Sequence, residues 1–325
     1  MRVLVVGGAG YIGSVTVVEL LAAGHEVLVL DDLSTGHRQA VHPEAELAVA
    51  EMGDRDLLDR LLSTHAVDAV VYLAGRIVAP ESLRRPDLYF QSNIAAAITV
   101  LNAIVAHGVE RLVFSSSAAV YGEPDAVPIP EDAPLRPVNP YGESKLMAER
   151  MLPWYEQAGG LRYVSLRYFN AAGASDLRGE DHRPETHLIP IVLQQALGQR
   201  DAVPLYGTDY PTPDGTCIRD YVHVSDLAAA HVLALDRLER GSGAYNLGSG
   251  TGFSNRQIIE AAERVTGKRI EVREEPRRPG DPVRLVASNE LARSELGWAP
   301  ALTTPEAIIE SAWRWHEAHP KGYPA

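Results

Sequence analysis

The chain has 325 residues, of which 46 % are hydrophobic and 22 % charged, the ordinary composition of a soluble globular enzyme with one large or two moderate domains. Its formal net charge of −13 argues against non-specific binding to nucleic acid or to an anionic membrane. The single cysteine, Cys217, excludes an intrachain disulfide and a metal–thiolate cluster. The opening MRVLVVGG predicts a strand rather than a signal peptide, and no apolar run approaches the length of a membrane span. We therefore expect a cytoplasmic protein with no metal site.

Short apolar runs alternate with amphipathic stretches over the first two thirds of the chain. Runs rich in Val and Leu predict strands over 3–7, 26–31, 45–50, 68–75, 111–117 and 162–170. The stretches between them predict helices over 12–23, 54–64, 86–107 and 140–158. Nearly continuous apolarity is typical of parallel strands that are buried on both faces. The series therefore predicts an α/β fold with a Rossmann-like, doubly wound parallel sheet.

The alternation changes near residue 171. Loops rich in Gly, Pro and Asp occupy 173–186, 207–216 and 276–282, and the patterns between and after them predict helices over 187–198, 225–239, 254–266 and 304–318. We expect residues 1–170 to form a Rossmann domain and residues 171–325 to form a smaller C-terminal α/β lobe that binds the substrate. Segments within about 222–250, such as AYNLGSG (244–250), are expected to return to the first domain.

A glycine-rich turn follows the first predicted strand. Gly7, Gly10 and Gly13 lie in GGAGYIG, where the missing Cβ atoms let the backbone approach a pyrophosphate at a helix N-terminus. A tight strand-to-helix turn is the alternative interpretation. Asp31 ends the second predicted strand, where its carboxylate can accept both hydroxyls of the adenosine ribose and would repel a 2′-phosphate. Asp32 adds a second charge or caps a local turn. This pattern favours NAD over NADP.

YGESK places Tyr141 and Lys145 four residues apart at the start of a predicted helix, so their side chains share one face. A phenol ionises near pH 10 in water, but a neighbouring ammonium and the positive nicotinamide ring favour the phenolate. Tyr141 would then serve as a general base near neutral pH. Three serines, Ser115–Ser117, end the fifth predicted strand, at the sheet edge where ligands bind. One of them could link the substrate oxygen to Tyr141, and the others need only hydrogen-bond locally.

At these residues the sequence resembles the extended short-chain dehydrogenase/reductases and, within them, the UDP-glucose 4-epimerase family. The likeness spans the whole chain and is most specific in DGTCIRDYVHV (214–224). It also includes SSSAAVYG (115–122), LRYFNAAG (166–173), HLIP (187–190), YNLGSG (245–250), RRPGD (277–281) and HPKGYP (319–324).

The resemblance implies epimerisation at C4 of a UDP-hexose, by transient hydride transfer to bound NAD and rotation of a 4-keto intermediate. Ser117 and Tyr141 would act on the sugar O4, while Lys145 binds the nicotinamide ribose. The implied cofactor-binding residues are Gly7, Gly10, Tyr11, Ile12, Gly13, Asp31, Glu51, Met52, Leu73, Ala74, Gly75, Tyr141, Lys145, Tyr168 and Phe169. The implied substrate-binding residues are Ser117, Tyr141, Asn170, His187, Leu188, Tyr206, Arg219, Arg278, Asp281 and Leu285, the arginines neutralising the diphosphate.

Three positions depart from the family pattern. Glu51 stands where the family commonly has Asp, and its side chain is longer. Ile77 stands where many members have lysine, and Arg76 precedes it. His187 stands where some members have Asn, which affects one substrate hydrogen bond. At the position that adjusts the pocket for the sugar's C2 substituent, Leu285 predicts a preference for UDP-galactose with weaker use of UDP-N-acetylgalactosamine. The alternative is that Leu285 only packs in the core.

Other functions remain open from the sequence. A 4,6-dehydratase usually has an Asp-Glu pair after the strand-end hydroxyl, whereas Ala118 and Ala119 follow Ser117 here. The chain could instead epimerise another UDP-sugar, namely a UDP-N-acetylhexosamine, uronic acid or pentose. It could also be a non-catalytic sensor of NAD or nucleotide sugars. The resemblance further implies a homodimer that pairs through the helices near 86–107 and 140–158.

Overall fold

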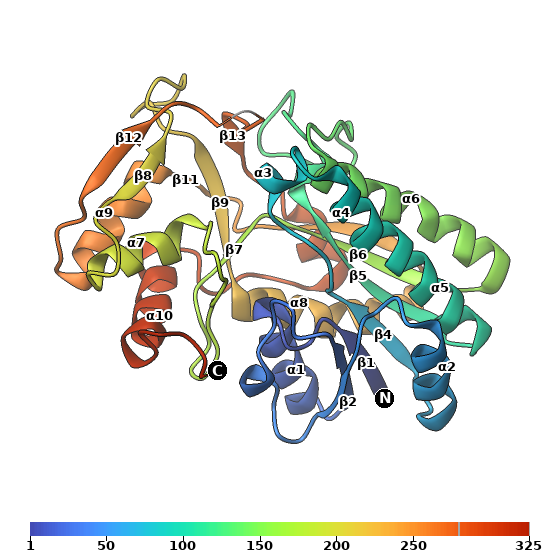
Figure 1. Cartoon of the computed structure of the whole chain (residues 1–325). Helices are drawn as coiled ribbons and strands as arrows, with labels where there is room; N and C mark the ends of the chain where they lie inside the picture. The colour runs from blue at the N-terminus through green and yellow to red at the C-terminus, as the bar shows by residue number, and fades with distance from the viewer. Residues whose placement is uncertain (279, 325) are drawn as a thin grey trace.

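The computed structural model describes residues 1–278 and 280–324. A large parallel sheet with helices on both faces makes up one part of the molecule, and a smaller lobe of helices and short strands lies beside it (Figure 1). The α/β class and the parallel sheet predicted from the sequence are confirmed.

Seven parallel strands form the large sheet in the order β10-β6-β5-β4-β1-β2-β3. The order reverses beside β1, which lies between β2 and β4, and ligands of open α/β sheets bind at the carboxyl ends of strands beside such a reversal. The strands are β1 (Arg2–Val6), β2 (Glu26–Asp31), β3 (Glu46–Val49), β4 (Ala69–Tyr72), β5 (Arg111–Ser117), β6 (Arg162–Tyr168) and β10 (Gly243–Leu247).

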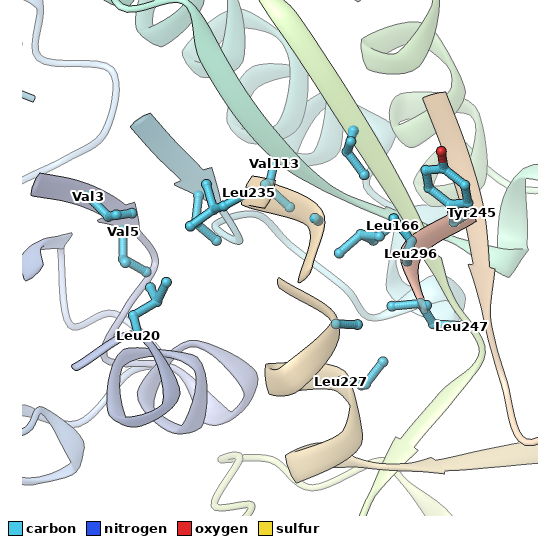
Figure 2. Close-up of a cluster of buried hydrophobic side chains, with 14 of the residues drawn as sticks. Val3, Val5, Leu20, Val113, Leu166, Leu227, Leu235, Tyr245, Leu247 and Leu296 are labelled. Carbon is cyan, nitrogen blue, oxygen red and sulfur yellow. The ribbon is translucent and has the colours of Figure 1, made fainter. Parts of the chain in front are cut away.

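Successive residues of β1 point to opposite faces of the sheet, and both faces are covered by helices. Val3 and Val5 pack in a core beneath α1 and α8, and Figure 2 shows them with Leu20 of α1 and Leu235 of α8. Leu4 belongs to the opposite core, beneath α2, α5 and α6. The helices are α1 (Tyr11–Ala22), α8 (Val224–Arg237), α2 (Arg55–Thr64), α3 (Ala79–Ser82), α4 (Pro86–Phe90), α5 (Ala96–Ala106) and α6 (Pro140–Gly159).

The helix predicted over 86–107 is continuous but contains one wider turn. Residues Gln91–Ala95, between α4 and α5, have π-helical geometry, which often occurs at functional sites. By length and composition alone, Pro86–Ala106 could cross a membrane, and 44 % of its most apolar window is buried inside the molecule. Core helices of globular proteins have the same property.

The smaller lobe is built on short strands whose partners are distant in sequence. Its central strand, β9 (Ile218–His223), pairs with β7 (Asn170–Ala172), β11 (Gly252–Ser254) and β13 (Arg284–Leu285), and β8 (Val203–Tyr206) pairs with β12 (Val272–Glu275). The helices α7 (Leu188–Ala196), α9 (Asn255–Thr266) and α10 (Pro305–Ala318) enclose a separate apolar core.

Two details differ from the sequence prediction. The strand expected over 162–170 ends at Tyr168, because the chain leaves the sheet at Phe169 and Asn170 begins the pairing of β7 with β9. Strands β8, β9, β12 and β13 were not predicted individually, because they are defined by pairing with segments far away in the sequence. Two elements from the second half of the sequence contact the part built on the large sheet: β10 pairs with β6, and α8 packs against α1. The division of the chain into domains at residue 170 stays a prediction.

Candidate active site

The turn from β1 to α1 leaves no room for side chains at two of its glycines. Gly7 has a φ of +88°, and a Cβ there would lie 2.6 Å from the backbone nitrogen of Ala74, at the end of β4. A Cβ on Gly13 would overlap the carbonyl oxygen of Gly7. Gly10 is the N-cap of α1 and has no side-chain hydrogen bond to the first turn. The N-terminus of α1, with Tyr11 and Ile12, is therefore free of side-chain caps and suited to an anion.

Asp31 and Asp32 follow this turn on the neighbouring strand but differ in environment. Asp31 is half-buried, and its carboxylate accepts hydrogen bonds from the backbone nitrogens of Ala9 and Leu33, each at 2.9 Å. Burial raises the pKa of Asp31, and the two backbone hydrogen bonds oppose that shift. Asp32 is exposed and accepts hydrogen bonds from the backbone and hydroxyl of Ser34, so it caps a local turn.

The segment after β4 comes back to the glycine turn. Leu73 and Ala74 both donate to the carbonyl of Val6, at 2.8 Å and 3.0 Å. Gly75 follows with a φ of +144° beside the side chain of Asn93. Two of the departures from the family pattern lie near this segment. The exposed Arg76, which precedes Ile77, forms an ion pair with Glu81 at 3.6 Å. Glu51 is exposed beyond β3, whereas the sulfur of Met52 accepts a hydrogen bond from Tyr72 at 3.1 Å.

Tyr141 and Lys145 lie in the first two turns of α6, whose N-cap Asn139 accepts a hydrogen bond from the Gly142 nitrogen at 2.8 Å. The Lys145 ammonium is 4 % exposed and donates to the carbonyl of Ser115 at 2.9 Å. Burial lowers the pKa of Lys145 to about 8, against the opposing charge of Glu149. Burial also raises the pKa of the Tyr141 phenol, and a hydrogen bond with the Ser117 side chain lowers it in part.

The structure distinguishes the three serines at the end of β5. Ser115 offers its backbone carbonyl to Lys145. Ser116 is buried and donates its hydroxyl to Glu149, away from Tyr141. Ser117 is half-buried, and its hydroxyl accepts from the backbone nitrogen of Ala119 at 3.2 Å. Of the three, Ser117 is the serine whose side chain lowers the pKa of Tyr141.

Two aromatic residues at the end of β6 border this centre. Tyr168 is buried, and its hydroxyl hydrogen-bonds with the ring of His231 on α8. Phe169 is also buried, in a cluster that includes Ala118 and Leu146. The end of β6 thus lies beside β5 and near the start of α6, where the predicted catalytic residues are.

Most of the predicted substrate-binding residues come from the smaller lobe. Arg219 on β9 is 7 % exposed and forms an ion pair with Asp281 at 3.2 Å. The guanidinium of Arg278 stacks over the ring of Tyr206, with its carbon 3.7 Å from the ring centre. Leu285 pairs in register with Arg219. The two cationic side chains therefore lie on neighbouring parts of one lobe.

The remaining predicted substrate-binding residues lie where the two parts of the molecule join. Asn170 is half-buried at the start of β7. His187 and Leu188 are the N-cap and first residue of α7, and both are half-buried. Leu285 packs against the cluster that contains Phe169.

Residues 3–248 match the NAD dependent epimerase/dehydratase family. The chain belongs to this family. It is 52 % identical to a UDP-glucose 4-epimerase of Lacticaseibacillus casei over 99 % of both chains. Its fold is similar to that of UDP-glucose 4-epimerase from Brucella ovis in complex with NAD, with a TM-score of 0.93, 44 % identity and coverage of 96 % and 97 % of the two chains. It is similar also to the Bifidobacterium longum enzyme in complex with NAD⁺ and UDP, with a TM-score of 0.95, 36 % identity and coverage of 99 % and 100 %.

As a member of this family the chain is an NAD-dependent epimerase. Helix α6, which carries Tyr141 and Lys145, rests on a buried polar network that the sequence analysis missed. Arg167 of β6 pairs with Glu149, one turn beyond Lys145, at 2.7 Å, and also donates to the Tyr121 hydroxyl at 2.8 Å. Glu149 in turn accepts from Ser116. The spacing of Glu149 four residues after Lys145 was a usable signal, because it places both side chains on one face of α6.

Asn93, in the wide turn between α4 and α5, is a second residue that the sequence analysis missed. Its side chain accepts from the backbone nitrogen of Arg76 at 2.8 Å and donates to the hydroxyl of Ser144 on α6 at 3.0 Å. It therefore connects the segment after β4 to the catalytic helix.

Asp220, within the stretch DGTCIRDYVHV, is a third buried polar residue that the sequence analysis missed. It is fully buried on β9 and accepts hydrogen bonds from the backbone nitrogens of Ser249, Gly250 and Ala287. The carboxylate holds the YNLGSG segment against the chain that follows β13. Nothing in the hydrophobic pattern marks a buried acid of this kind.

Proposed function

We propose that this chain interconverts UDP-glucose and UDP-galactose by inverting C4 of the sugar, with Tyr141 as the acid–base residue. The observation that carries this proposal is the buried Lys145, whose ammonium donates to the carbonyl of Ser115 at the end of β5 and which lies one turn of α6 beyond Tyr141, in an NAD-dependent epimerase fold. Epimerisation at C4 is the activity of the relatives that this chain matches along its full length.

The residues at the carboxyl edge of the sheet fit NAD. The uncapped N-terminus of α1 offers free backbone N–H groups to the pyrophosphate, and Asp31 ends the next strand, where a ribose would lie. Bound NAD supplies a hydride acceptor and, once reduced, a hydride donor, so the reaction has no net redox change. We assign Gly7, Gly10, Gly13, Asp31 and Lys145 to holding it.

The acid–base work falls to Tyr141. The net effect of its surroundings in this chain, Lys145 included, is to raise its pKa, so ionisation near neutral pH requires the additional positive charge that the nicotinamide ring would supply. Tyr141 would then take the proton of the 4-hydroxyl, directly or through Ser117, while C4 loses its hydride, and would return that proton to O4 after the 4-keto sugar has turned and C4 has regained the hydride on its opposite face.

The smaller lobe holds the nucleotide while the sugar turns. Arg219 and Arg278 carry the positive charge that a diphosphate needs, and planar guanidinium groups can bind it through paired hydrogen bonds. The ion pair of Arg219 with Asp281 and the stacking of Arg278 on Tyr206 hold both side chains in place. The binding energy of the UDP group thereby retains a reactive intermediate. Further substrate contacts are assigned to Asn170, His187, Leu188 and Leu285.

Turnover of purified protein tests the proposal. UDP-galactose should be converted to UDP-glucose with NAD and without any external oxidant or reductant. NADP should serve poorly because Asp31 would repel its 2′-phosphate. A parallel assay of UDP-N-acetylgalactosamine, a UDP-uronic acid and a UDP-pentose would show whether another sugar is preferred. Binding of NAD and UDP-sugars without turnover of any of them would instead indicate a sensor.

We also propose that the enzyme is a homodimer that pairs through the Pro86–Ala106 helix and α6. Large apolar side chains are exposed on these helices, with Trp154 69 %, Phe90 39 % and Met147 37 % exposed. Two such helices from each subunit would form a four-helix interface. Light scattering at micromolar concentration should give the dimer mass, and Trp154→Glu should lower it. A monomer mass for the unaltered protein would contradict this proposal.

The domain assignment and the compartment complete the proposal. Residues 1–170 form the NAD-binding domain, to which α8 and β10 add, and residues 171–325 otherwise form the UDP-sugar-binding lobe. The only thiol, that of Cys217, is buried and free, as is common in the reducing cytoplasm. Fractionation of the native cells would test that location.

A further inference from the structure

Four side chains of the loop between β7 and α7 converge on one point. Glu180, His182, Glu185 and His187 each offer one ligand atom, and all four atoms lie within 4.8 Å of one another. The side chains of the two glutamates are 6 % and 2 % exposed, and those of the two histidines are 19 % and 39 % exposed. Neither the cofactor edge nor the acid–base pair uses this cluster, which we call the His–Glu cluster.

The distances within the His–Glu cluster match those between ligands of one metal ion. His182 Nδ1 lies 3.2 Å from Glu180 Oε1 and 3.7 Å from Glu185 Oε2. His187 Nδ1 lies 2.7 Å from Glu180 Oε1 and 3.2 Å from Glu185 Oε1. Nitrogen and oxygen ligands that bind zinc at about 2.1 Å in a tetrahedron are about 3.4 Å apart.

Hydrogen bonding does not account for this convergence. Of the four nitrogen–oxygen approaches, only the one between His187 Nδ1 and Glu185 Oε1 has hydrogen-bond geometry. His182 Nδ1 and Glu185 Oε2 are buried with no hydrogen-bond partner. The other oxygen of Glu185 accepts from the backbone nitrogens of Thr186 at 2.7 Å and His187 at 2.8 Å, so the carboxylate is fixed with Oε2 free. Apart from the approach of His182 Nδ1 at 3.7 Å, nothing pairs with this buried oxygen, and a buried carboxylate oxygen without a hydrogen bond is costly unless something binds it.

We propose that the His–Glu cluster binds one divalent transition-metal ion of the zinc class. Two neutral imidazoles and two carboxylates suit zinc in ligand type and number, and they make the occupied site electrically neutral. The sequence analysis expected no metal because it considered thiolate ligands alone. The spacing of the four residues in EDHRPETH also matches no helical metal motif, so only the folded loop brings them together.

The site would tie the loop to the elements on either side of it. His187 is the N-cap of α7, and the ring of His182 packs edge-on against Tyr11 of the glycine turn, with ring centres 6.4 Å apart. The ion would therefore brace the loop between the cofactor turn and the smaller lobe. It would also fix His187 with its Nδ1 on the metal and a proton on Nε2, which, if the proposed function holds, could donate to the substrate.

An ion-pair network is the rival explanation. Without a metal, burial alone would lower the pKa of His187, yet the charges of Glu180 and Glu185 outweigh that effect and raise it to about 10. Two imidazolium–carboxylate pairs would also be neutral overall. The experiment must therefore measure the metal itself rather than catalytic activity.

Full-length protein without an affinity tag would be depleted with EDTA, titrated with Co²⁺ or Zn²⁺, desalted and analysed by mass spectrometry for metal. Wild type should retain one equivalent per chain, the Co²⁺ form should show the intense visible bands of tetrahedral cobalt, and Zn²⁺ should raise its Tm. His182→Ala and Glu185→Gln should lose at least about nine tenths of the metal. His107→Gln is the matched control, because His107 pairs with Asp59 at 2.9 Å on α2, outside the cluster, and it should retain the full equivalent.

Two results would overturn the proposal. Depleted wild type that retains no Co²⁺ or Zn²⁺ after desalting would show that the cluster is only an ion-pair network. Equal retention by the cluster variants would show that metal binds adventitiously elsewhere. If the variants fail to fold, the cobalt spectrum and the Zn²⁺-dependent Tm of wild type still decide the question. Either failure would leave the epimerase assay unaffected, so the two proposals can be judged separately.

Discussion

The two sides of the active site are built in different ways. The side formed by the large sheet places its groups with backbone contacts and buried polar side chains: Lys145 is fixed by a carbonyl, and Glu149 by Arg167 and Ser116. The side formed by the smaller lobe relies on longer side chains at loops and short strands, such as Arg278 stacked on Tyr206. Of the substrate-binding residues proposed for the lobe, Arg219 alone is buried to a comparable degree.

From this difference we expect the sheet side to govern the chemical step and the lobe side to govern which sugar is preferred. A group fixed by several buried contacts has little freedom, so its replacement should affect the reaction or the fold strongly. A side chain on a short strand at the join can change in size at lower cost. Variants of the sheet side should therefore show large effects on every substrate, and variants of the lobe should show smaller effects that differ between substrates.

The largest effect is expected at Tyr141. Tyr141→Phe should lower kcat by about 10²–10⁴-fold on every UDP-sugar that the enzyme accepts, because it removes the acid–base hydroxyl. Steady-state kinetics with UDP-galactose would measure it. Tyr155→Phe is the control on the same helix, where the hydroxyl donates to Asn102 at 2.8 Å, away from the site. Turnover of Tyr141→Phe within a few-fold of wild type would refute the assignment.

The buried pair beneath the catalytic helix should matter most for stability. Glu149→Gln leaves the charge of Arg167 buried and uncompensated, and loss of one partner of a buried ion pair costs about 3–5 kcal/mol of unfolding free energy. Urea denaturation would measure the change. Glu239→Gln breaks the exposed ion pair with Arg111 and should change stability little. Equal effects of the two substitutions would show that the network does not support the helix.

The sequence predicted the sheet side of the molecule better than the lobe. Six of the seven strands of the large sheet come from Val- and Leu-rich runs in the first two thirds of the chain, and the glycine turn and the Tyr141–Lys145 pair have local spacings. The short strands β8 and β12 are defined by partners far away in sequence, which periodicity cannot reveal. Buried polar residues such as Asn93 and Asp220 escape prediction because their burial depends on tertiary hydrogen bonds.

Lys145 should lower the unfolding free energy of the protein and at the same time support its turnover. Its pKa is lowered by burial from 10.5 to about 8, so between these values the unfolded chain holds a proton that the folded chain has released, and stability rises with pH. Below pH 8 the folded protein bears the full cost of the buried charge. Lys145→Met should therefore be more stable than wild type at pH 7 by about 1–3 kcal/mol, and the gap should narrow toward pH 10.

Thermal unfolding of cofactor-free protein across this pH range would measure that gap, with the exposed Lys268→Met as the control. The same Lys145→Met variant should turn over more slowly, and its pH–rate profile should shift to higher pH because Tyr141 loses a neighbouring positive charge. If the difference in stability between Lys145→Met and wild type stays constant with pH, the charge of Lys145 has no free-energy cost in the folded protein.

The smallest effect is expected on the lobe side, at Leu285. Leu285 lies on β13 in register with Arg219 and packs against the cluster of Phe169, so it borders both the proposed substrate site and the cofactor pocket. Leucine is smaller than tyrosine, so an N-acetyl group at C2 of the sugar should be tolerated but not favoured. Leu285→Tyr should force that group into strain of about 1–3 kcal/mol, which is about ten- to a hundredfold in rate if it is fully expressed in the transition state.

The measurement is kcat/KM of Leu285→Tyr for UDP-galactose and for UDP-N-acetylgalactosamine, since the ratio of the two cancels any general loss of folded enzyme. The ratio should shift toward UDP-galactose by about tenfold or more, whereas Tyr141→Phe should lower both values together. Leu285→Ile, which keeps the volume, is the control and should leave the ratio unchanged. Equal losses on both substrates, or no loss on either, would mean that Leu285 only packs in the core and that specificity is set elsewhere in the lobe.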